Sequence, residues 1–322
     1  MTESQRIFNK VLEETSKVII GYEDIVEDFL ICLSAGGHII LEGVPGISKT
    51  TLAKTIATVV GLRFKRIQFT QDLLPTDITG HYFYNQKQQE FLFRPGPIFA
   101  NLVLADEINR APSKTQSALL EAMEENQVTV EGSTYELKEP FMVIATINPV
   151  ELEGVYTLPE AQMDRFMMKS QMGYLSSDME LNLLRLKNVG WKDQKANRIE
   201  EDVFSILRKE IRACRADDTI LTYVRDLVKR TRNDNNVVLG ASPRAAEQII
   251  YASKGSAILD GRAYVLPDDV KKVFRKMVPH RVSVALDAEL EGKSPENVVE
   301  EILASVPVVA SPKQRGKLKV GG

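Results

Sequence analysis

The chain has 322 residues, which is enough for about two domains with a hydrophobic core each. Hydrophobic residues make up 43% of it and charged residues 26%, as in an ordinary globular protein, and the lack of any run of about 18 apolar residues predicts no membrane insertion. The net charge is −3, and without the four cations of residues 313–319 it is −7 for residues 1–310, which disfavours a broad nucleic-acid-binding surface.

Two features bear on where the protein works. The first residues lack the apolar region of a secretion signal. The two cysteines, Cys32 and Cys214, have neither the spacing of a disulfide framework nor that of a metal site, which fits a reducing compartment. We therefore expect a cytoplasmic protein.

The amino-terminal part predicts two helices, at residues 3–17 and from residue 23 to about residue 34, joined by an apolar turn. Ile20 and Gly21 lie in this turn. They are either packing residues of the turn or part of a loop that faces the adenine of a nucleotide, and the second reading depends on a phosphate site nearby.

A strand, a glycine-containing turn and a helix follow between residues 38 and 60. The apolar run His38-Ile-Ile-Leu41 predicts a buried strand, and residues 51–60 predict a helix. The turn between them, Gly43-Val-Pro-Gly-Ile-Ser-Lys-Thr50, has the layout of a phosphate-binding loop. Such a loop holds phosphate oxygens with its backbone N–H groups and with the N-terminus of the helix.

Each residue type in this loop has a chemical reason. Gly43 and Gly46 let the backbone turn its N–H groups inward without a Cβ in the way. Lys49 neutralises the β- and γ-phosphates, and the Thr50 hydroxyl is a ligand for Mg²⁺. Ser48 stands where the general motif has glycine, so the loop by itself leaves an accidental match open.

Residues 63–69 alternate like a strand, and the next segment is rich in turn residues. Within it, aromatic runs at residues 81–84 and 90–93 flank a polar tract, which predicts a hairpin that protrudes from the core. Its aromatic side chains form either a contact surface or the hairpin's own small cluster. Residues 127–137 predict a second hairpin.

Two later strands end in polar side chains. Residues 101–107 run from apolar residues into Asp106 and Glu107, at the strand end where ligands bind in open α/β sheets. Asp106 would hold Mg²⁺ and Glu107 would polarise the attacking water, unless the two acids are merely solvated. Residues 141–148 end in Asn148, which either orients that water or is an ordinary turn residue before proline.

The remaining chain divides into a helix at residues 114–125, a short apolar strand that ends near Met168, and a mainly helical part after a polar linker at residues 187–198. We expect a first domain at 1–190, a second at 191–310 and a disordered basic tail at 311–322. Further helices are predicted at 177–186, 200–213, 217–232, 242–259 and 267–277.

Five motifs occur in a fixed order along nearly the whole chain: Gly43-Val-Pro-Gly-Ile-Ser-Lys-Thr50, Asp106-Glu-Ile-Asn-Arg-Ala-Pro112, Ala145-Thr-Ile-Asn-Pro149, Leu158-Pro-Glu-Ala-Gln-Met-Asp-Arg-Phe166 and Gly240-Ala-Ser-Pro-Arg-Ala245. In this order they resemble a MoxR-type AAA+ ATPase, in which a small residue other than glycine is usual at the position of Ser48. The resemblance implies an α/β fold: a P-loop αβα core with a parallel five-stranded sheet, followed by an all-α lid.

The resemblance also implies roles. Lys49 and Thr50 belong to Walker A, Asp106 and Glu107 to Walker B, Asn148 to sensor 1, and Arg244 to sensor 2, in cis or on a neighbour's nucleotide. Arg165 matches an arginine finger that reaches a neighbouring subunit, with Arg110 as the alternative. The expected nucleotide contacts are Ile20, Gly21, Gly43, Val44, Pro45, Gly46, Ile47, Ser48, Lys49, Thr50 and Thr51, with Thr50 and Asp106 toward the metal.

The function implied is Mg²⁺-dependent ATP hydrolysis by a hexameric ring that remodels a partner protein, in this family often beside a protein with a von Willebrand A domain. The lack of an Asn-Lys-x-Asp motif favours ATP over GTP. Two alternatives stay open: a motor or loader acting on nucleic acid, which the acidic body disfavours, and a non-hydrolysing switch, which Glu107 disfavours.

Overall fold

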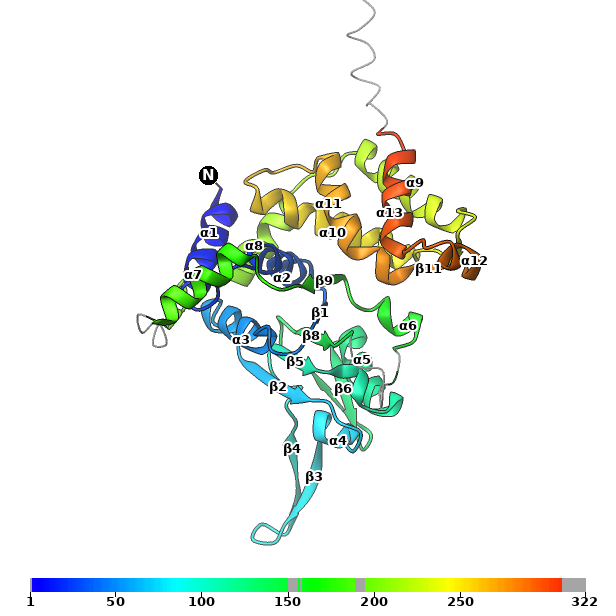
Figure 1. Cartoon of the computed structure of the whole chain (residues 1–322). Helices are drawn as coiled ribbons and strands as arrows, with labels where there is room; N and C mark the ends of the chain where they lie inside the picture. The colour runs from blue at the N-terminus through cyan, green and yellow to red at the C-terminus, as the bar shows by residue number, and fades with distance from the viewer. Residues whose placement is uncertain (1, 150–155, 157, 189–194, 309–322) are drawn as a thin grey trace, which may run out of the picture. The chain divides into compact units, whose positions relative to one another are not determined.

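The computed structural model describes residues 2–149, 156, 158–188 and 195–308 (Figure 1). It divides into two compact units, one formed by residues 6–205 and one by residues 206–308 together with residues 2–5. Of the linker expected at residues 187–198, residues 189–194 lie outside the described residues, and α7 (Ser177–Asn188) ends directly before them; the tail expected at residues 311–322 lies outside them entirely. No helix within the described ranges is long and apolar enough to cross a membrane.

The larger unit is built on one parallel sheet of five strands, as expected. In spatial order the strands are β2 (Phe64–Gln68), β5 (Leu102–Asp106), β8 (Met142–Ile147), β1 (Ile39–Gly43) and β9 (Met168–Met172). The three central strands are almost wholly buried, which explains their unbroken apolar sequences. Since all five strands are parallel, their carboxyl ends lie at one edge of the sheet, and β2 is an outer strand.

Helices cover both faces of this sheet (Figure 1). Helix α5 (Ser113–Glu125) buries Leu119, Leu120 and Met123 in the same cluster as Val103 and Val143 of the strands. The other helices of the unit include α1 (Glu3–Ser16), α2 (Glu23–Ala35), α3 (Lys49–Val59), α4 (Pro75–Thr79), α6 (Glu160–Met163) and α7 (Ser177–Asn188). The predicted αβα core is thus confirmed.

One predicted strand was misplaced. The sequence suggested an apolar strand that ends near Met168, but β9 begins there and runs to Met172. Its buried face alternates, and it includes Ser170, whose hydroxyl donates to the buried carboxylate of Asp28 (2.7 Å). Lys169 pairs with Glu42 of β1 (3.0 Å). The strand tolerates these polar residues because Asp28 and Glu42 satisfy them, and its sequence is therefore not the apolar run that would have identified it.

Both predicted hairpins are present. The long one pairs β3 (Gly80–Asn85) with β4 (Glu90–Pro95), and the short one pairs β6 (Gln127–Val130) with β7 (Ser133–Glu136). The aromatic side chains of the long hairpin fall into two groups. Tyr82 and Phe93 pack at its base, whereas Phe83, Tyr84 and Phe91 are exposed. The hairpin's own cluster is therefore found at its base, whereas the aromatic side chains of the tip are exposed and the contact-surface reading stays a prediction for them.

The second unit is mainly helical, and the four predicted helices are found as α8 (Val203–Ala213), which spans the boundary, α9 (Asp218–Arg232), α10 (Pro243–Leu259) and α11 (Pro267–Met277). The sequence analysis missed β10 (Val237–Leu239), β11 (Ser283–Val284), α12 (Leu286–Leu290) and α13 (Pro295–Ser305). The signal for α13 was present: the Ser294 hydroxyl accepts from the Asn297 backbone (3.2 Å), and Pro295 occupies the first helical position.

Candidate active site

The turn between β1 and α3 has the backbone of a phosphate-binding loop. Gly46 has a φ of +84°, and a Cβ placed there would meet nothing within 4 Å, so glycine serves the backbone conformation rather than space. Gly43 is different, because its Cβ would lie 2.5 Å from the Met172 carbonyl oxygen. Glycine is required at that position for the close approach of β1 to β9.

Ser48 stands where the general motif has glycine, and its backbone conformation shows why glycine is usual there. It has φ 67° and ψ 24°, the left-handed conformation that glycine adopts without strain, and it stands just before the first residue of α3. The strain costs roughly 1–2 kcal/mol relative to glycine. The Ser48 carbonyl accepts from Leu52 N (2.9 Å), so α3 starts directly from this residue. The Lys49 ammonium folds back over the loop and donates to the Gly43 carbonyl.

The carboxylate of Asp106 lies beside the start of α3. It is 7% exposed, and its Oδ1 accepts from the Thr146 hydroxyl (2.6 Å). Its Oδ2 accepts from the Thr50 hydroxyl (3.3 Å) and from Arg66 Nε (2.8 Å). A hydroxyl and a carboxylate oxygen are hard ligands of the kind Mg²⁺ prefers, and Mg²⁺ commonly takes few protein ligands beside phosphate and water. The donor set therefore fits this cation.

Glu107 follows in a strained conformation, with φ 57° and ψ 50°. Its backbone N–H donates to the Thr146 hydroxyl (2.8 Å), so one threonine fixes both acids. Its carboxylate accepts from Gln68 Nε2 (2.7 Å) and pairs with Arg110 Nε (3.3 Å). The Glu107 carboxylate is thus held by Gln68 of β2 and by Arg110 of the turn that follows.

Three side chains of this network were not predicted from the sequence: Arg66, Gln68 and Thr146. The signal for the first two was the alternation of residues 63–69, which puts them on one face of β2, opposite the buried Ile67. The missing information was the register between strands. In the structure Gln68 pairs with Asp106, and Ala145 pairs with Ala105, which brings Thr146 beside the acids.

The other predicted site residues lie as follows. Asn148, directly after β8, is 5% exposed at the same sheet edge. Arg165 lies against α5, where it donates to the Leu120 carbonyl and pairs with Glu124 (2.8 Å). Arg244 is the second residue of α10, in the other unit. The structure thus groups the loop, the two acids and Asn148, and it holds Arg165 on a different element.

The loop at Ile20 and Gly21 lies against α7 and the segment before it. A Cβ on Gly21 would be 2.7 Å from Leu175 Cδ2 and 3.2 Å from Met179 Sδ. The neighbouring Tyr22 hydroxyl donates to the Gly173 carbonyl (3.0 Å). The apolar side chains of Leu175 and Met179 therefore border the residues predicted to face adenine. Neither was predicted from the sequence.

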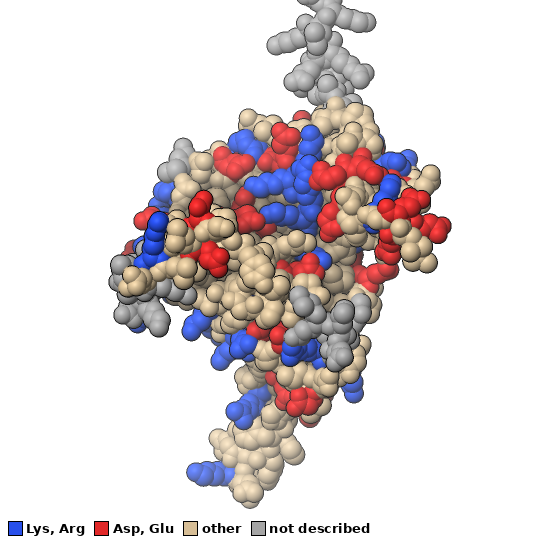
Figure 2. Space-filling model, viewed as in Figure 1, with Lys and Arg blue, Asp and Glu red and all other residues tan. Residues whose placement is uncertain are grey.

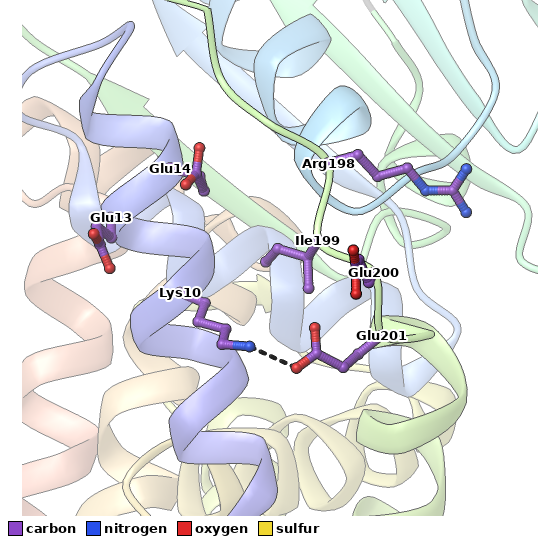
Figure 3. A pocket seen from close by; sticks show the side chains of 7 residues that line it. All are labelled: Lys10, Glu13, Glu14, Arg198, Ile199, Glu200 and Glu201. Atoms are coloured by element: carbon purple, nitrogen blue, oxygen red, sulfur yellow. Dashed lines mark hydrogen bonds and ion pairs between the residues drawn. The ribbon is translucent and has the colours of Figure 1, made fainter.

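A separate cleft of about 580 Å³ lies between α1 and the segment that leads to α8 (Figure 3). Its lining is Lys10, Glu13, Glu14, Arg198, Ile199, Glu200 and Glu201. Glu201 pairs with Lys10 (2.6 Å) and Arg6 (2.9 Å), and the hydrogen bond from Lys10, more than any other contact, lowers the pKa of this carboxyl to about 2. None of these residues belongs to the loops after β1, β5 or β8.

Comparisons with known proteins agree with this geometry. Residues 38–168 match the family model "ATPase family associated with various cellular activities (AAA)", and residues 229–302 match the model "AAA lid domain". The chain is 45% identical to the uncharacterized protein YeaC of Bacillus subtilis, over 97% of each chain. It is 42% identical to chaperone MoxR1 of Mycobacterium tuberculosis, over 95% of this chain and 84% of that protein. The solved structure of a putative ATPase from Cytophaga hutchinsonii matches with a TM-score of 0.85 and 42% identity, over 95% of this chain and 97% of that one.

Proposed function

The chain belongs to the MoxR family of AAA ATPases, and we propose that it couples Mg²⁺-dependent ATP hydrolysis to the remodelling, assembly or activation of a partner protein. The observation that carries the choice of a protein partner is the exposed aromatic tip of the β3–β4 hairpin, on the unit that holds the nucleotide site. The name chaperone, which MoxR1 carries, supports the same choice.

The residues at the sheet edge divide the chemistry among them. Lys49 neutralises the β- and γ-phosphates, and the backbone from Gly43 to Thr51 holds the phosphate oxygens. Thr50 and Asp106 would hold Mg²⁺, which would supply positive charge against the charge that develops on the phosphate oxygens. Glu107 polarises the attacking water, and Asn148 orients it.

Two arginines complete the proposal. Arg165 acts on the nucleotide of a neighbouring subunit in a ring of six, and Arg244 acts from the lid as sensor 2. Arg110, the alternative trans arginine, pairs with Glu107 of its own chain. Arg165 is also paired within its own chain, with Glu124 of α5 (2.8 Å), but only the pairing of Arg110 involves an acid of the proposed nucleotide site. We therefore assign Arg110 to its own site and Arg165 to the neighbour's.

The composition of the hairpin suits a polypeptide better than a nucleic acid. Phe91 is 70% exposed and Tyr84 50% exposed, and their rings lie 5.3 Å apart as a cross-strand pair. Residues 80–95 contain two cations and one anion, and Figure 2 shows this hairpin as largely uncharged. Affinity for DNA comes mainly from several cations on phosphates, whereas exposed aromatic residues are typical anchors of protein interfaces.

The test compares ATPase rates with single-stranded DNA, duplex DNA and a candidate partner carrying a von Willebrand A domain. At physiological salt we expect the partner protein to stimulate the ATPase rate and neither form of DNA to do so. The double variant Tyr84→Ala/Phe91→Ala should lose this stimulation and keep its basal rate within about twofold, because surface substitutions rarely disturb the fold. Gln86→Ala, at the same tip, is the matched control. Strong, salt-resistant stimulation by DNA would replace this function by that of a nucleic-acid motor.

A further inference from the structure

A pocket of about 360 Å³ lies at the bases of the two hairpins and includes residues next to the amino ends of the sheet strands. Arg63 directly precedes β2, and Lys138 comes shortly before β8. In a parallel sheet the amino ends of the strands lie at one edge, and the five residues of β2 place that edge about 16 Å from the carboxyl ends. The pocket is therefore separate from the loop and the acids of the proposed nucleotide site.

Three aromatic rings form the apolar part of this pocket: Phe93, Phe99 and Tyr135. The rings of Phe93 and Tyr135 are stacked with 13° between their planes, and Phe99 meets Tyr135 edge-on. All three rings pack against the buried core of the unit, yet each is only partly buried. Because the rings are already held in place, binding a large apolar side chain on them costs little further ordering.

Two cations stand at the same pocket, on segments that one amide joins. Asn101 Oδ1 accepts from the Arg63 backbone N–H (3.3 Å), and Asn101 Nδ2 donates to the carbonyls of Lys138 (3.4 Å) and Pro140 (2.9 Å). The side chains of Arg63 and Lys138 are exposed, and neither has a hydrogen-bond or ion-pair partner among the described residues. Both cations are therefore available to anionic groups of a ligand.

The pocket also contains an anion, Glu136, which forms no ion pair with Arg63 or Lys138. A nucleic acid carries a phosphate at every nucleotide and is usually held by several cations, so this acid disfavours it. A polypeptide can direct its carboxylates to the two cations and a backbone N–H to Glu136. The volume is near the lower end for ligand pockets, which suits one large side chain and its neighbours. Charge and size together favour a protein segment.

We propose that this pocket binds an acidic segment of a partner protein. One aromatic side chain of the segment packs on Phe93, Phe99 and Tyr135, and its carboxylates bind Arg63 and Lys138. The inference rests on the proposed choice of a protein partner, and it specifies the chemistry of the segment by which that partner docks. The site is distinct from the exposed tip of the β3–β4 hairpin.

The first test measures binding without ATP and without a partner. Fluorescence anisotropy follows short labelled peptides that carry phenylalanine, tyrosine or tryptophan between acidic, neutral or basic flanks, together with a labelled single-stranded DNA. The acidic peptides should bind at least about tenfold more tightly than the basic ones, and less tightly as salt rises. Alanine in place of the aromatic residue should abolish saturable binding.

Three results of this test would overturn the proposal. The first is that no aromatic peptide saturates below about 1 mM. The second is that basic peptides bind as tightly as acidic ones. The third is that the DNA binds more tightly than every acidic peptide, which would assign the pocket to nucleic acid.

Charge reversal locates the site. Arg63→Glu/Lys138→Glu should invert the preference toward peptides with basic flanks, because the ligand then meets these two acids and Glu136. Lys87→Glu/Lys114→Glu makes the same charge change at exposed positions that do not line the pocket, and it should keep the acidic preference. Since all four cations are exposed, basal ATPase rates should stay within about twofold of wild type. Equal loss of acidic-peptide binding in both variants would mean nonspecific attraction and overturn the proposal.

The last measurement separates this inference from the function on which it rests. With the partner protein, Arg63→Glu/Lys138→Glu should need about tenfold more partner for half-maximal ATPase stimulation. If the partner stimulates both proteins at the same concentration, the pocket is not its docking site and only this inference fails. If acidic peptides bind as expected but no partner protein stimulates the ATPase, the pocket stands as a peptide site and the proposed function fails.

Discussion

The nucleotide edge of the sheet and the β3–β4 hairpin belong to the same unit but differ in the burial of their key side chains. At the edge, Asp106, Thr146 and Asn148 are buried, and hydrogen bonds from neighbouring strands fix the two acids. On the hairpin, Phe91 is mostly exposed, and its cross-strand neighbour Tyr84 is half exposed. Strand register can place reactive groups to within a few tenths of an ångström, whereas an exposed hairpin tip gains its full set of contacts from a partner.

The aromatic side chains change from packed to exposed between the base of the hairpin and its tip. The Phe93 ring stacks on Tyr135 of the short hairpin with centroids 4.4 Å apart, and Phe99 packs against both. The Tyr82 and Tyr135 hydroxyls share a hydrogen bond. The two hairpins are therefore anchored to one another at their bases, and the exposed tip lies beyond this cluster. The comparison predicts large catalytic effects at the edge and selective effects along the hairpin.

The largest effect is expected from Lys49→Ala. The phosphates lose their main cation, so ATP binding should fall below detection and turnover should drop by about 10³-fold or more. Fluorescent-nucleotide binding and phosphate release measure the two. Lys54→Ala, on an exposed position of the same helix, is the matched control and should behave like wild type. Tight ATP binding by Lys49→Ala would show that the loop after β1 is not the phosphate site.

Arg165→Ala should come next. If Arg165 completes a neighbour's site, ATP affinity should persist while turnover falls by about 10³-fold, the scale of arginine-finger effects. Mixing this variant with Lys49→Ala protein should recover part of the activity at mixed interfaces, and light scattering with a non-hydrolysable analogue should report a ring. Failure to recover activity at any mixing ratio, with Arg110→Ala recovering it instead, would transfer the role to Arg110.

A smaller effect should separate the base of the hairpin from its tip. Phe93→Ala removes a stacked ring and should raise the amide hydrogen-exchange rates of β3 and β4 about tenfold, because their local opening becomes easier by about 1–2 kcal/mol. Phe91→Ala should change these rates by less than about twofold. Equal rates in the two variants would mean that the base cluster does not hold the hairpin.

The smallest effect is expected in the cleft of Figure 3, where the charges are exposed. The folded pKa of Glu201 lies near 2, below its usual 4.5, so its ion pairs stabilise the fold above about pH 4.5 and are lost as the pH falls toward 2. Glu201→Gln should therefore lower the melting temperature slightly at pH 7, and the difference from wild type should shrink at pH 3. Glu200→Gln is the charge-matched control. A difference that grows on acidification would contradict this sign.

The sequence predicted those parts of the site that lie in continuous segments. Asp106, Glu107 and Asn148 end apolar runs, and Lys49 and Thr50 end the glycine-containing turn after another. The rule that ligands bind at strand ends places these residues together. Arg66, Gln68 and Thr146 could not be found in this way, because their role depends on which residues pair across strands. The single chain carries no direct record of that register.

The sequence predicts those strands well in which nearly every residue is buried, and it predicts strands with alternating burial less well. The buried strands β1, β5 and β8 have unmistakable apolar sequences, and the five-strand topology came from the motif resemblance. The edge strand β9 was misplaced because it contains two polar residues that find partners in the fold: Ser170 with Asp28 of helix α2, and Lys169 with Glu42 of β1. The aromatic residues of the hairpin had two readings, because sequence alone does not reveal that Tyr135 covers Phe93 and leaves Phe91 exposed.

We propose that Glu107 performs the hydrolytic step at a site where Lys49, Thr50 and Asp106 would hold the nucleotide and its metal. The decisive experiment measures two quantities on the same Glu107→Gln preparation: ATP affinity in the presence of Mg²⁺ and the rate of phosphate release. We expect an affinity within about threefold of wild type and turnover reduced by at least about 10²-fold, since only the water-polarising carboxylate is lost. Turnover at the wild-type rate would remove Glu107 from the mechanism.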